Sequence, residues 1–117
     1  KNNFKFLTIN KQYIVEKDNG FLKLEKILVN VNPISLTKIS YMLSKLKRLL
    51  PGFIGYIGID IIIKNYDIYI VEINPRFTTS FIGLYESLGI NIIDLFISPY
   101  SQKNIISGKK YLIRTHE

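Results

Sequence analysis

With 117 residues, 47% of them hydrophobic, the chain suffices for one packed domain or for part of one. It contains no cysteine, which excludes a disulfide framework and a thiolate metal site, and its single histidine, His116, is too isolated for a histidine-based metal site. The formal net charge of +7 comes from scattered lysines rather than one basic run, which favours a solvated lysine-rich surface over nucleic-acid binding.

The first predicted elements are two strands. Residues 4–15 mix β-branched, aromatic and polar residues in partial alternation, which is typical of a strand. Lys17-Asp18-Asn19-Gly20 predicts a turn, and a second, less regular strand is expected within residues 21–31. Asn32-Pro33 ends that strand, because proline cannot donate to a strand ladder.

A helix is predicted next. Ser35 or Thr37 can cap its N-terminus, and it is expected to run to about Leu50, where Pro51-Gly52 ends it. Apolar side chains recur along it at helical spacing, at Leu36, Ile39, Leu43, Leu46 and Leu50.

The second half of the chain alternates between strands and short helices. Residues 53–64 and 68–74 are rich in isoleucine and valine and predict a pair of strands. Short helices are expected at about 81–88 and 91–97, and a last strand at 111–114. Together these elements predict an α+β fold with a largely antiparallel sheet and packed helices.

Oxygen-bearing side chains fall on the two isoleucine-rich strands. If residues 65–67 form a three-residue hairpin loop, Asp60 lies opposite Glu72, and Gly58 lies opposite Asn74, all on one face. The same register makes two further pairs, Lys64 with Ile68 and Ile62 with Ile70. A two-residue loop would instead separate the two carboxylates, so a site on this face depends on the register.

Two facing carboxylates among isoleucine and valine repel each other and lose hydration, and a divalent cation relieves both problems. Carboxylate and amide oxygens favour a hard cation such as Mg²⁺, with Asp60, Glu72 and Asn74 as its protein ligands. Arg76 follows closely enough to donate to phosphate oxygens. Taken singly, these residues also fit plain structural roles as an edge residue, a cap or a turn. Their combination favours a metal–phosphate site.

The segment GYIGIDIII…IYIVEINPRFTTSFIGL, from Gly55 to Leu84, resembles the C-terminal half of the ATP-grasp fold. Its E-x-N-P-R motif is similar to that of the carbamoyl-phosphate synthase branch, and residues 75–84 look most like archaeal tyramine–glutamate ligases. The resemblance implies that residues 1–117 are the C-terminal subdomain of an ATP-grasp domain, a fragment of a longer enzyme. The upstream lysines, hinge and phosphate-covering loop of that family are not recognisable here.

Carried over by position, the resemblance implies a role for each residue of the motif. Asp60, Glu72 and Asn74 are expected to bind magnesium, and Arg76 is expected to hold the transferring phosphate and stabilise its charge. Ile62 and Val71 are expected beside adenine, although simple alternation puts Val71 and Glu72 on opposite faces. The hydroxyl residues after the motif either contact the acceptor substrate or, as we favour, cap the next helix; these are Thr78, Thr79 and Ser80.

The activity that the resemblance implies is Mg-ATP-dependent joining of a small-molecule carboxylate to an amine through an acyl phosphate, with Mn²⁺ as a possible substitute for Mg²⁺. The alternatives are a non-catalytic or regulatory nucleotide-binding domain, a structural half-domain and a basic nucleic-acid-binding module. No apolar run approaches the roughly 18–20 residues of a membrane span, and the N-terminus lacks the features of a signal peptide. A cytoplasmic protein without a membrane partner is expected, and a homo-oligomer is compatible with the sequence.

Overall fold

The structure, a computed structural model, describes residues 4–89, 91–97 and 110–115. The chain divides into a hairpin unit, which takes in Lys1–Phe6 and Asn32–Thr78, and a sheet unit, which takes in Leu7–Val31 and Thr79–Glu117. Both units contain helices and antiparallel strands, so the α+β fold class is confirmed. In the part of the chain that the structure describes, no helix is both long and apolar enough to cross a membrane.

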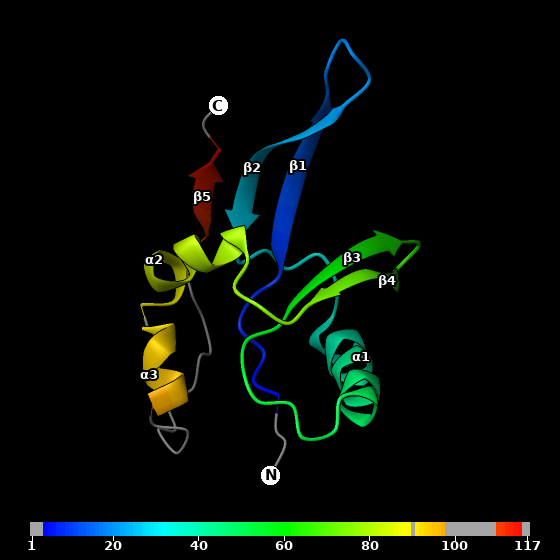
Figure 1. Cartoon of the computed structure of the whole chain (residues 1–117). Coiled ribbons are helices and arrows are strands. Elements are labelled where there is room, and N and C mark those ends of the chain that lie inside the picture. Colours follow the sequence, from blue (N-terminus) through cyan, green and yellow to red (C-terminus); the bar gives the residue numbers. More distant parts are fainter. Residues whose placement is uncertain (1–3, 90, 98–109, 116–117) are drawn as a thin grey trace. The chain divides into compact units, whose positions relative to one another are not determined.

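The sheet unit is built on three antiparallel strands, which lie in the order β1-β2-β5 (Figure 1). These are β1 (Asn10–Glu16), β2 (Leu22–Val29) and β5 (Tyr111–Arg114). Ile27, Val29 and Ile113 are buried, and Ile27 pairs with Ile113 across β2 and β5. Since side chains alternate along a strand, this buried set marks one face of the sheet as its core face.

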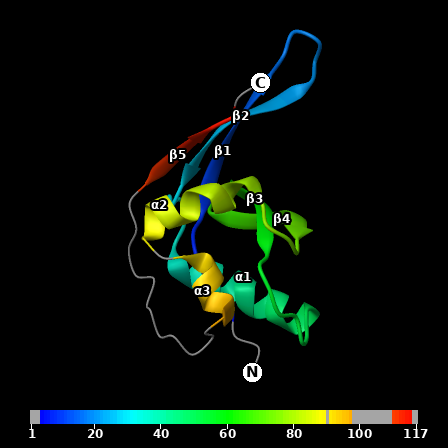
Figure 2. The ribbon, with the colours of Figure 1, turned by 60° about the vertical axis from the view of Figure 1, so that its left-hand side comes forward.

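Short helices complete the sheet unit. The 3₁₀ helix η1 (Thr79–Gly83) packs against β2 and β5 (Figure 2), where a side chain on Gly83 would overlap Val29 and crowd Ile113. Glycine therefore lets the η1 backbone approach the sheet closely. Two further helices follow, α2 (Leu84–Leu88) and α3 (Ile92–Ile97).

The hairpin unit contains one long helix, α1 (Leu36–Leu49). Of the two predicted caps, Ser35 is the one used, since its hydroxyl accepts a hydrogen bond from the Lys38 backbone N–H at 3.4 Å. Ile39 and Leu46 of the predicted apolar stripe are buried. The helix therefore forms where its capping and periodicity predict it.

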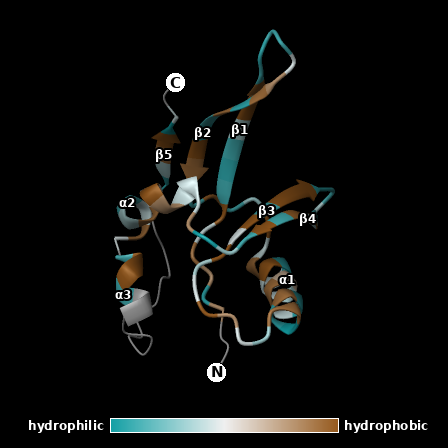
Figure 3. Cartoon of the chain, viewed as in Figure 1, coloured by the Kyte–Doolittle hydropathy of each residue, from teal (hydrophilic) through white to brown (hydrophobic). Residues whose placement is uncertain are grey.

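The other part of the hairpin unit is a two-stranded antiparallel ribbon, β3 (Gly58–Lys64) and β4 (Asp67–Asn74). Figure 3 shows that β3 is hydrophobic over most of its length. The turn has two residues, Asn65 and Tyr66, with φ values of 52° and 62°. Positive φ at both positions is what a type I′ hairpin turn requires, because that turn matches the twist of the strands.

The predicted three-residue loop is therefore wrong. Near the turn the pairs are Lys64–Asp67, Ile63–Ile68, Ile62–Tyr69 and Ile61–Ile70, in place of the predicted Lys64–Ile68 and Ile62–Ile70. The register then shifts between Asp60 and Ile61, so that Val71 is an extra, unpaired residue on β4. Beyond this bulge the predicted pairs, Asp60 with Glu72 and Gly58 with Asn74, are confirmed.

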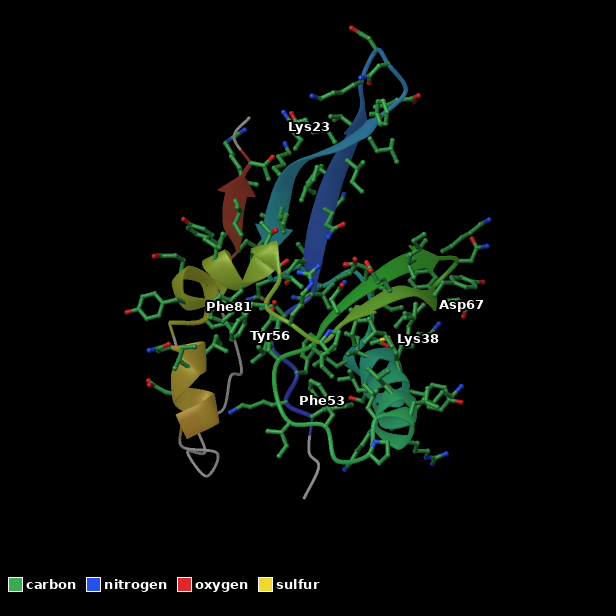
Figure 4. The ribbon with its side chains drawn as sticks, viewed as in Figure 1. Lys23, Lys38, Phe53, Tyr56, Asp67 and Phe81 are labelled. Atoms are coloured by element: carbon green, nitrogen blue, oxygen red, sulfur yellow. The ribbon has the colours of Figure 1, made fainter. Side chains whose placement is uncertain are left out.

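The hairpin turn is tied to the start of α1. Figure 4 shows Lys38 and Asp67 close together, and the Lys38 ammonium lies 3.7 Å from the Asp67 carboxylate. The same ammonium donates a hydrogen bond to the Tyr66 carbonyl. Both side chains are exposed, so this ion pair orients the turn more than it stabilises the fold.

Two strands begin later in the structure than the sequence predicts. Residues 4–9 lie outside β1 and residues 53–57 lie outside β3, although both were expected within strands. The predicted helix at 81–88 starts as the 3₁₀ turn η1. His116 lies outside the described residues.

Candidate metal and phosphate site

The β-bulge at Val71 places the two carboxylates of the hairpin face to face. A two-residue turn alone would have put Asp60 opposite Val71, and the bulge adds the one residue that restores Asp60 opposite Glu72. Directly opposite residues on an antiparallel pair have Cβ atoms about 4.5–5.5 Å apart, so the two carboxylates share one face of the ribbon. The turn and the bulge thus jointly set the pairing.

Asn74 connects the two carboxylates. Its side-chain amide nitrogen lies 3.5 Å from Asp60 Oδ2 and 3.4 Å from Glu72 Oε2. With only 8% of its surface exposed, Asn74 is the most buried of the three. One amide donor between two acidic side chains offsets part of their mutual repulsion in the absence of a cation.

Arg76 lies on the other side of the Asn74 amide. Its Nη2 donates to Asn74 Oδ1 at 3.5 Å and its Nη1 donates to the Phe77 carbonyl at 3.2 Å. The Arg76 side chain is exposed, and within the described part of the chain it makes no ion pair with Asp60 or Glu72. Its guanidinium is therefore positioned by neutral oxygens and keeps its positive charge uncompensated beside the acidic pair.

Apolar side chains flank the carboxylates along the ribbon. Ile62 shares a β3 face with Asp60 and is 57% exposed, while Val71 is 63% exposed. Because Val71 is the bulge residue, the alternation that seemed to separate it from Glu72 does not hold there. Tyr69, which lies opposite Ile62, was missed from the sequence because the predicted loop length placed Ile70 there.

Phe77, the residue after Arg76, forms an aromatic pair with Tyr56. The rings of Tyr56 and Phe77 lie 5.2 Å apart at an interplanar angle of 46°. Burial raises the pKa of the Tyr56 hydroxyl, an effect that a side-chain hydrogen bond with Thr78 partly offsets. Thr78 also packs on Gly58, where a Cβ would overlap its methyl group. Sequence reasoning considered Thr78 only as a cap or a substrate contact, and the nearby Gly-x-x-Gly spacing was the available signal for this close packing.

The donor set fits a hard divalent cation. Asp60, Glu72 and Asn74 offer carboxylate and amide oxygens on one face, which are ligands that Mg²⁺ and Mn²⁺ accept. Within residues 4–89, 91–97 and 110–115, no group of three or more histidine, cysteine, aspartate or glutamate side chains could hold a metal by itself. A cation on this face would therefore need further ligands from water or from substrate phosphates, which is how Mg²⁺ is usually bound.

Comparison with known proteins gives a family match over most of the chain. The family described as the ATP-grasp domain matches residues 1–80, which include the first 50 residues, where no motif was recognised. No solved structure gives a significant match.

Two curated relatives match nearly the whole chain. The tyramine–L-glutamate ligase of Methanocaldococcus jannaschii is 34% identical over 110 residues, which cover 92% of this chain and 33% of the relative. The tyramine–L-glutamate ligase of Methanocaldococcus fervens is 41% identical over 110 residues, which cover 92% of this chain and 35% of the relative. The chain thus spans about a third of the length of the curated relatives it matches.

Proposed function

The chain belongs to the ATP-grasp domain family, and from that premise we propose that it carries the magnesium and phosphate-binding part of an ATP-dependent carboxylate–amine ligase. The observation that carries the proposal is the bulged hairpin, which sets Asp60 opposite Glu72 beside a buried Asn74. The activity is proposed for the complete protein, of which we take residues 1–117 to be the C-terminal subdomain of the ATP-grasp domain. A cytoplasmic location remains part of the same proposal.

In this proposal Asp60, Glu72 and Asn74 hold magnesium, with manganese as a substitute. The Asn74 amide turns its nitrogen toward the carboxylates and its oxygen toward Arg76, so the amide has to rotate before its oxygen becomes a ligand. When bound, the cation would supply positive charge that offsets the negative charge of phosphate oxygens. The hairpin residues contribute by presenting the carboxylates in a fixed register.

Arg76 is proposed as the catalytic residue of this part. The substrate carboxylate oxygen attacks the γ-phosphorus of ATP, ADP leaves, and an acyl phosphate forms. The amine nitrogen then attacks the acyl carbon, phosphate leaves and the nitrogen loses a proton. Arg76 donates to the transferring phosphate in both steps, because its guanidinium offers a planar set of donors. Ile62 and Val71 are proposed to lie against adenine.

The substrates of the reaction are proposed from the relatives. Both are named for tyramine and L-glutamate, so this amine and this carboxylate are the first pair to test. Identities of 34% and 41%, each over 110 residues, support this choice. The motif itself carries no information on which amine is used, since Asp60, Glu72 and Arg76 serve the phosphate chemistry.

The test compares ATP binding by the complete protein with and without magnesium, by calorimetric titration, for wild type, Glu72→Gln and Glu86→Gln. Glu86 lies exposed on α2 of the sheet unit, so its variant removes the same charge away from the hairpin. We expect magnesium-dependent affinity to fall at least about tenfold in Glu72→Gln and to stay unchanged in Glu86→Gln. Equal affinities in all three proteins would overturn the metal assignment.

A second readout separates catalysis from nucleotide sensing. ADP release by the wild-type protein is measured with glutamate and tyramine together, and with each one alone. Release that needs both substrates supports ligation, because the carboxylate must be activated and the amine must complete the turnover. ATP binding without substrate-dependent ADP release would favour a regulatory nucleotide-binding domain.

A further inference from the structure

The three-stranded sheet of the sheet unit has a second face, opposite its core face, on which positive charge gathers. Side chains alternate between the two faces, and the core face holds Ile27, Val29 and Ile113. The second face therefore carries the alternate positions of the three strands, which are Lys11, Tyr13, Lys26, Leu28, Leu112 and Arg114. Three of these six side chains are cationic and none is acidic.

The strand register places two of these cations directly opposite each other. Lys26 of β2 is paired with Arg114 of β5 and, on its other side, with Tyr13 of β1. Like charges directly opposite on a sheet are destabilising. Glu25, which precedes Lys26, is the extra residue of the β-bulge in β2. Within the described residues neither Lys26 nor Arg114 makes an ion pair, so no such pair offsets their repulsion.

A tyrosine ring restrains two of the cations. The ammonium nitrogens of Lys11 and Lys26 lie 4.9 Å and 4.7 Å from the centroid of the Tyr13 ring. An aromatic face attracts a cation, and this attraction restrains two otherwise flexible side chains while they keep their charge. Side chains that are already ordered lose less conformational entropy when a ligand binds to them.

We propose that this cationic face, formed by Lys11, Tyr13, Lys26 and Arg114, binds a compact oligophosphate without a metal ion. Phosphate oxygens accept charge-assisted hydrogen bonds from ammonium and guanidinium groups. A multivalent anion between Lys26 and Arg114 also relieves the repulsion between the two side chains. The face uses none of the residues of the proposed magnesium site, so the inference goes beyond the proposed function and does not depend on it.

The extent of the cationic face favours a compact anion over a polymer. Neighbouring strands are about 4.7–4.9 Å apart, so the face spans only two strand spacings from β1 to β5. Single-stranded nucleic acid is usually bound along a longer positive groove, with its bases stacked on open aromatic rings. The Tyr13 ring is partly buried and already contacts two ammonium groups. A diphosphate or triphosphate fits this arrangement, either free or as the phosphate tail of a nucleotide.

The test is calorimetric titration of the complete protein with inorganic tripolyphosphate, in EDTA and at about 0.15 M salt, where long-range attraction between exposed charges is screened. We expect Lys26→Met and Arg114→Gln each to weaken binding about five- to tenfold, because each removes a charge-assisted contact. Lys45→Met is the matched control, since the Lys45 ammonium also lies over a tyrosine ring, 4.4 Å from the Tyr41 centroid, but on α1 of the hairpin unit. It should bind tripolyphosphate as wild type does.

A second measurement distinguishes weak binding from misfolding. Without ligand, Lys26→Met should raise the melting temperature, because it removes one of two like charges that lie opposite each other. Tripolyphosphate should raise the melting temperature of wild type more than that of Lys26→Met. Tyr13→Phe keeps the ring and should bind as wild type does. Tyr13→Leu releases both ammonium groups and should bind about threefold more weakly.

Three results would overturn the inference. The first is that wild type does not bind tripolyphosphate, and the second is equal weakening in Lys26→Met and Lys45→Met, which would show attraction to net charge only. The third is weakening by Glu72→Gln as large as that by Lys26→Met, which would place the anion at the hairpin. ATP, titrated in the same way, identifies the source of the phosphate. If Lys26→Met weakens ATP binding too, the face takes the tail of a nucleotide, and if it weakens only tripolyphosphate binding, the face takes free oligophosphate.

Discussion

Thr78 packs so closely on Gly58 that the methyl group of Thr78 occupies the place where a Cβ of residue 58 would lie. Gly58 is paired with Asn74, so this contact fixes the segment after β4 against the start of β3. We expect Gly58→Ala to lower the free energy of unfolding by about 1–3 kcal/mol, because overpacking forces the neighbouring chain to move. Urea denaturation of the two proteins measures the difference.

The double variant Gly58→Ala with Thr78→Ser is the control for this prediction. Serine lacks the methyl group that would meet the new Cβ but keeps the hydroxyl that is hydrogen-bonded to Tyr56. We expect the double variant to recover most of the lost stability relative to Gly58→Ala. If it recovers none, the destabilisation arises from the backbone of Gly58 rather than from the contact with Thr78.

The Tyr56 hydroxyl is expected to make stability fall at alkaline pH. Its pKa in the folded chain lies above the ordinary value of 10.0, mainly because burial disfavours the phenolate. As pH rises past about 10, the unfolded chain loses this proton before the folded chain does. The stabilising contribution is therefore complete below the unfolded pKa and is lost as pH rises through the folded pKa. Comparing wild type with Tyr56→Phe by urea denaturation between pH 8 and pH 11 isolates it.

Tyr56→Phe should remove this part of the alkaline decline while leaving the ring contact with Phe77 in place. The other titrating groups are common to both proteins, so only the difference between the two pH profiles is informative. Parallel profiles for the two proteins up to pH 11 would show that burial of Tyr56 does not perturb its ionisation.

The hairpin shows where sequence reasoning succeeds and where it stops. The pairing of Asp60 with Glu72 was predicted correctly, because the hypothesis of one site for both carboxylates allows only a register that puts them on the same face. The turn length and the bulge could not be predicted. A two-residue turn with a bulge at Val71 pairs Asp60 with Glu72, and so does a three-residue loop with a regular ladder. Only the pairs near the turn distinguish the two, and Tyr66 is an unusual residue for a type I′ turn.

Elsewhere too, the regular elements could be predicted from the sequence and the contacts of irregular backbone could not. Capping and periodicity locate α1, and Ser35 caps it as expected. The contact of Thr78 with Gly58 and the ring pair of Tyr56 and Phe77 depend on the path of irregular backbone outside the strands, for which no periodic pattern exists. The aromatic residues near the site could therefore be found only from the structure.

The Tyr66 backbone is expected to cost stability at the hairpin turn. Its φ of 62° lies in the left-handed region, which disfavours a residue with a Cβ, and its side chain is 75% exposed. We expect Tyr66→Gly to raise the free energy of unfolding by about 0.5–1 kcal/mol, as relief of strain exceeds the added entropy of the unfolded chain. The midpoint of urea denaturation measures this. Tyr66→Ala keeps the Cβ and should show no gain, and an equal gain in both variants would trace the effect to the lost ring.

The pair Asp60 and Glu72 is expected to lower the stability of the metal-free protein and to bind the cation. Like charges directly opposite on a sheet are destabilising, and the Asn74 amide nitrogen lies between Asp60 and Glu72. Without magnesium, Asp60→Asn should therefore raise the free energy of unfolding by about 0.5 kcal/mol.

Addition of magnesium and ATP should raise the melting temperature of wild type but not of Asp60→Asn, because ligands stabilise only the state that binds them. Asp94→Asn, a change of equal charge on α3, should show neither effect. If Asp60→Asn keeps the full thermal shift, Asp60 is not a ligand of the cation.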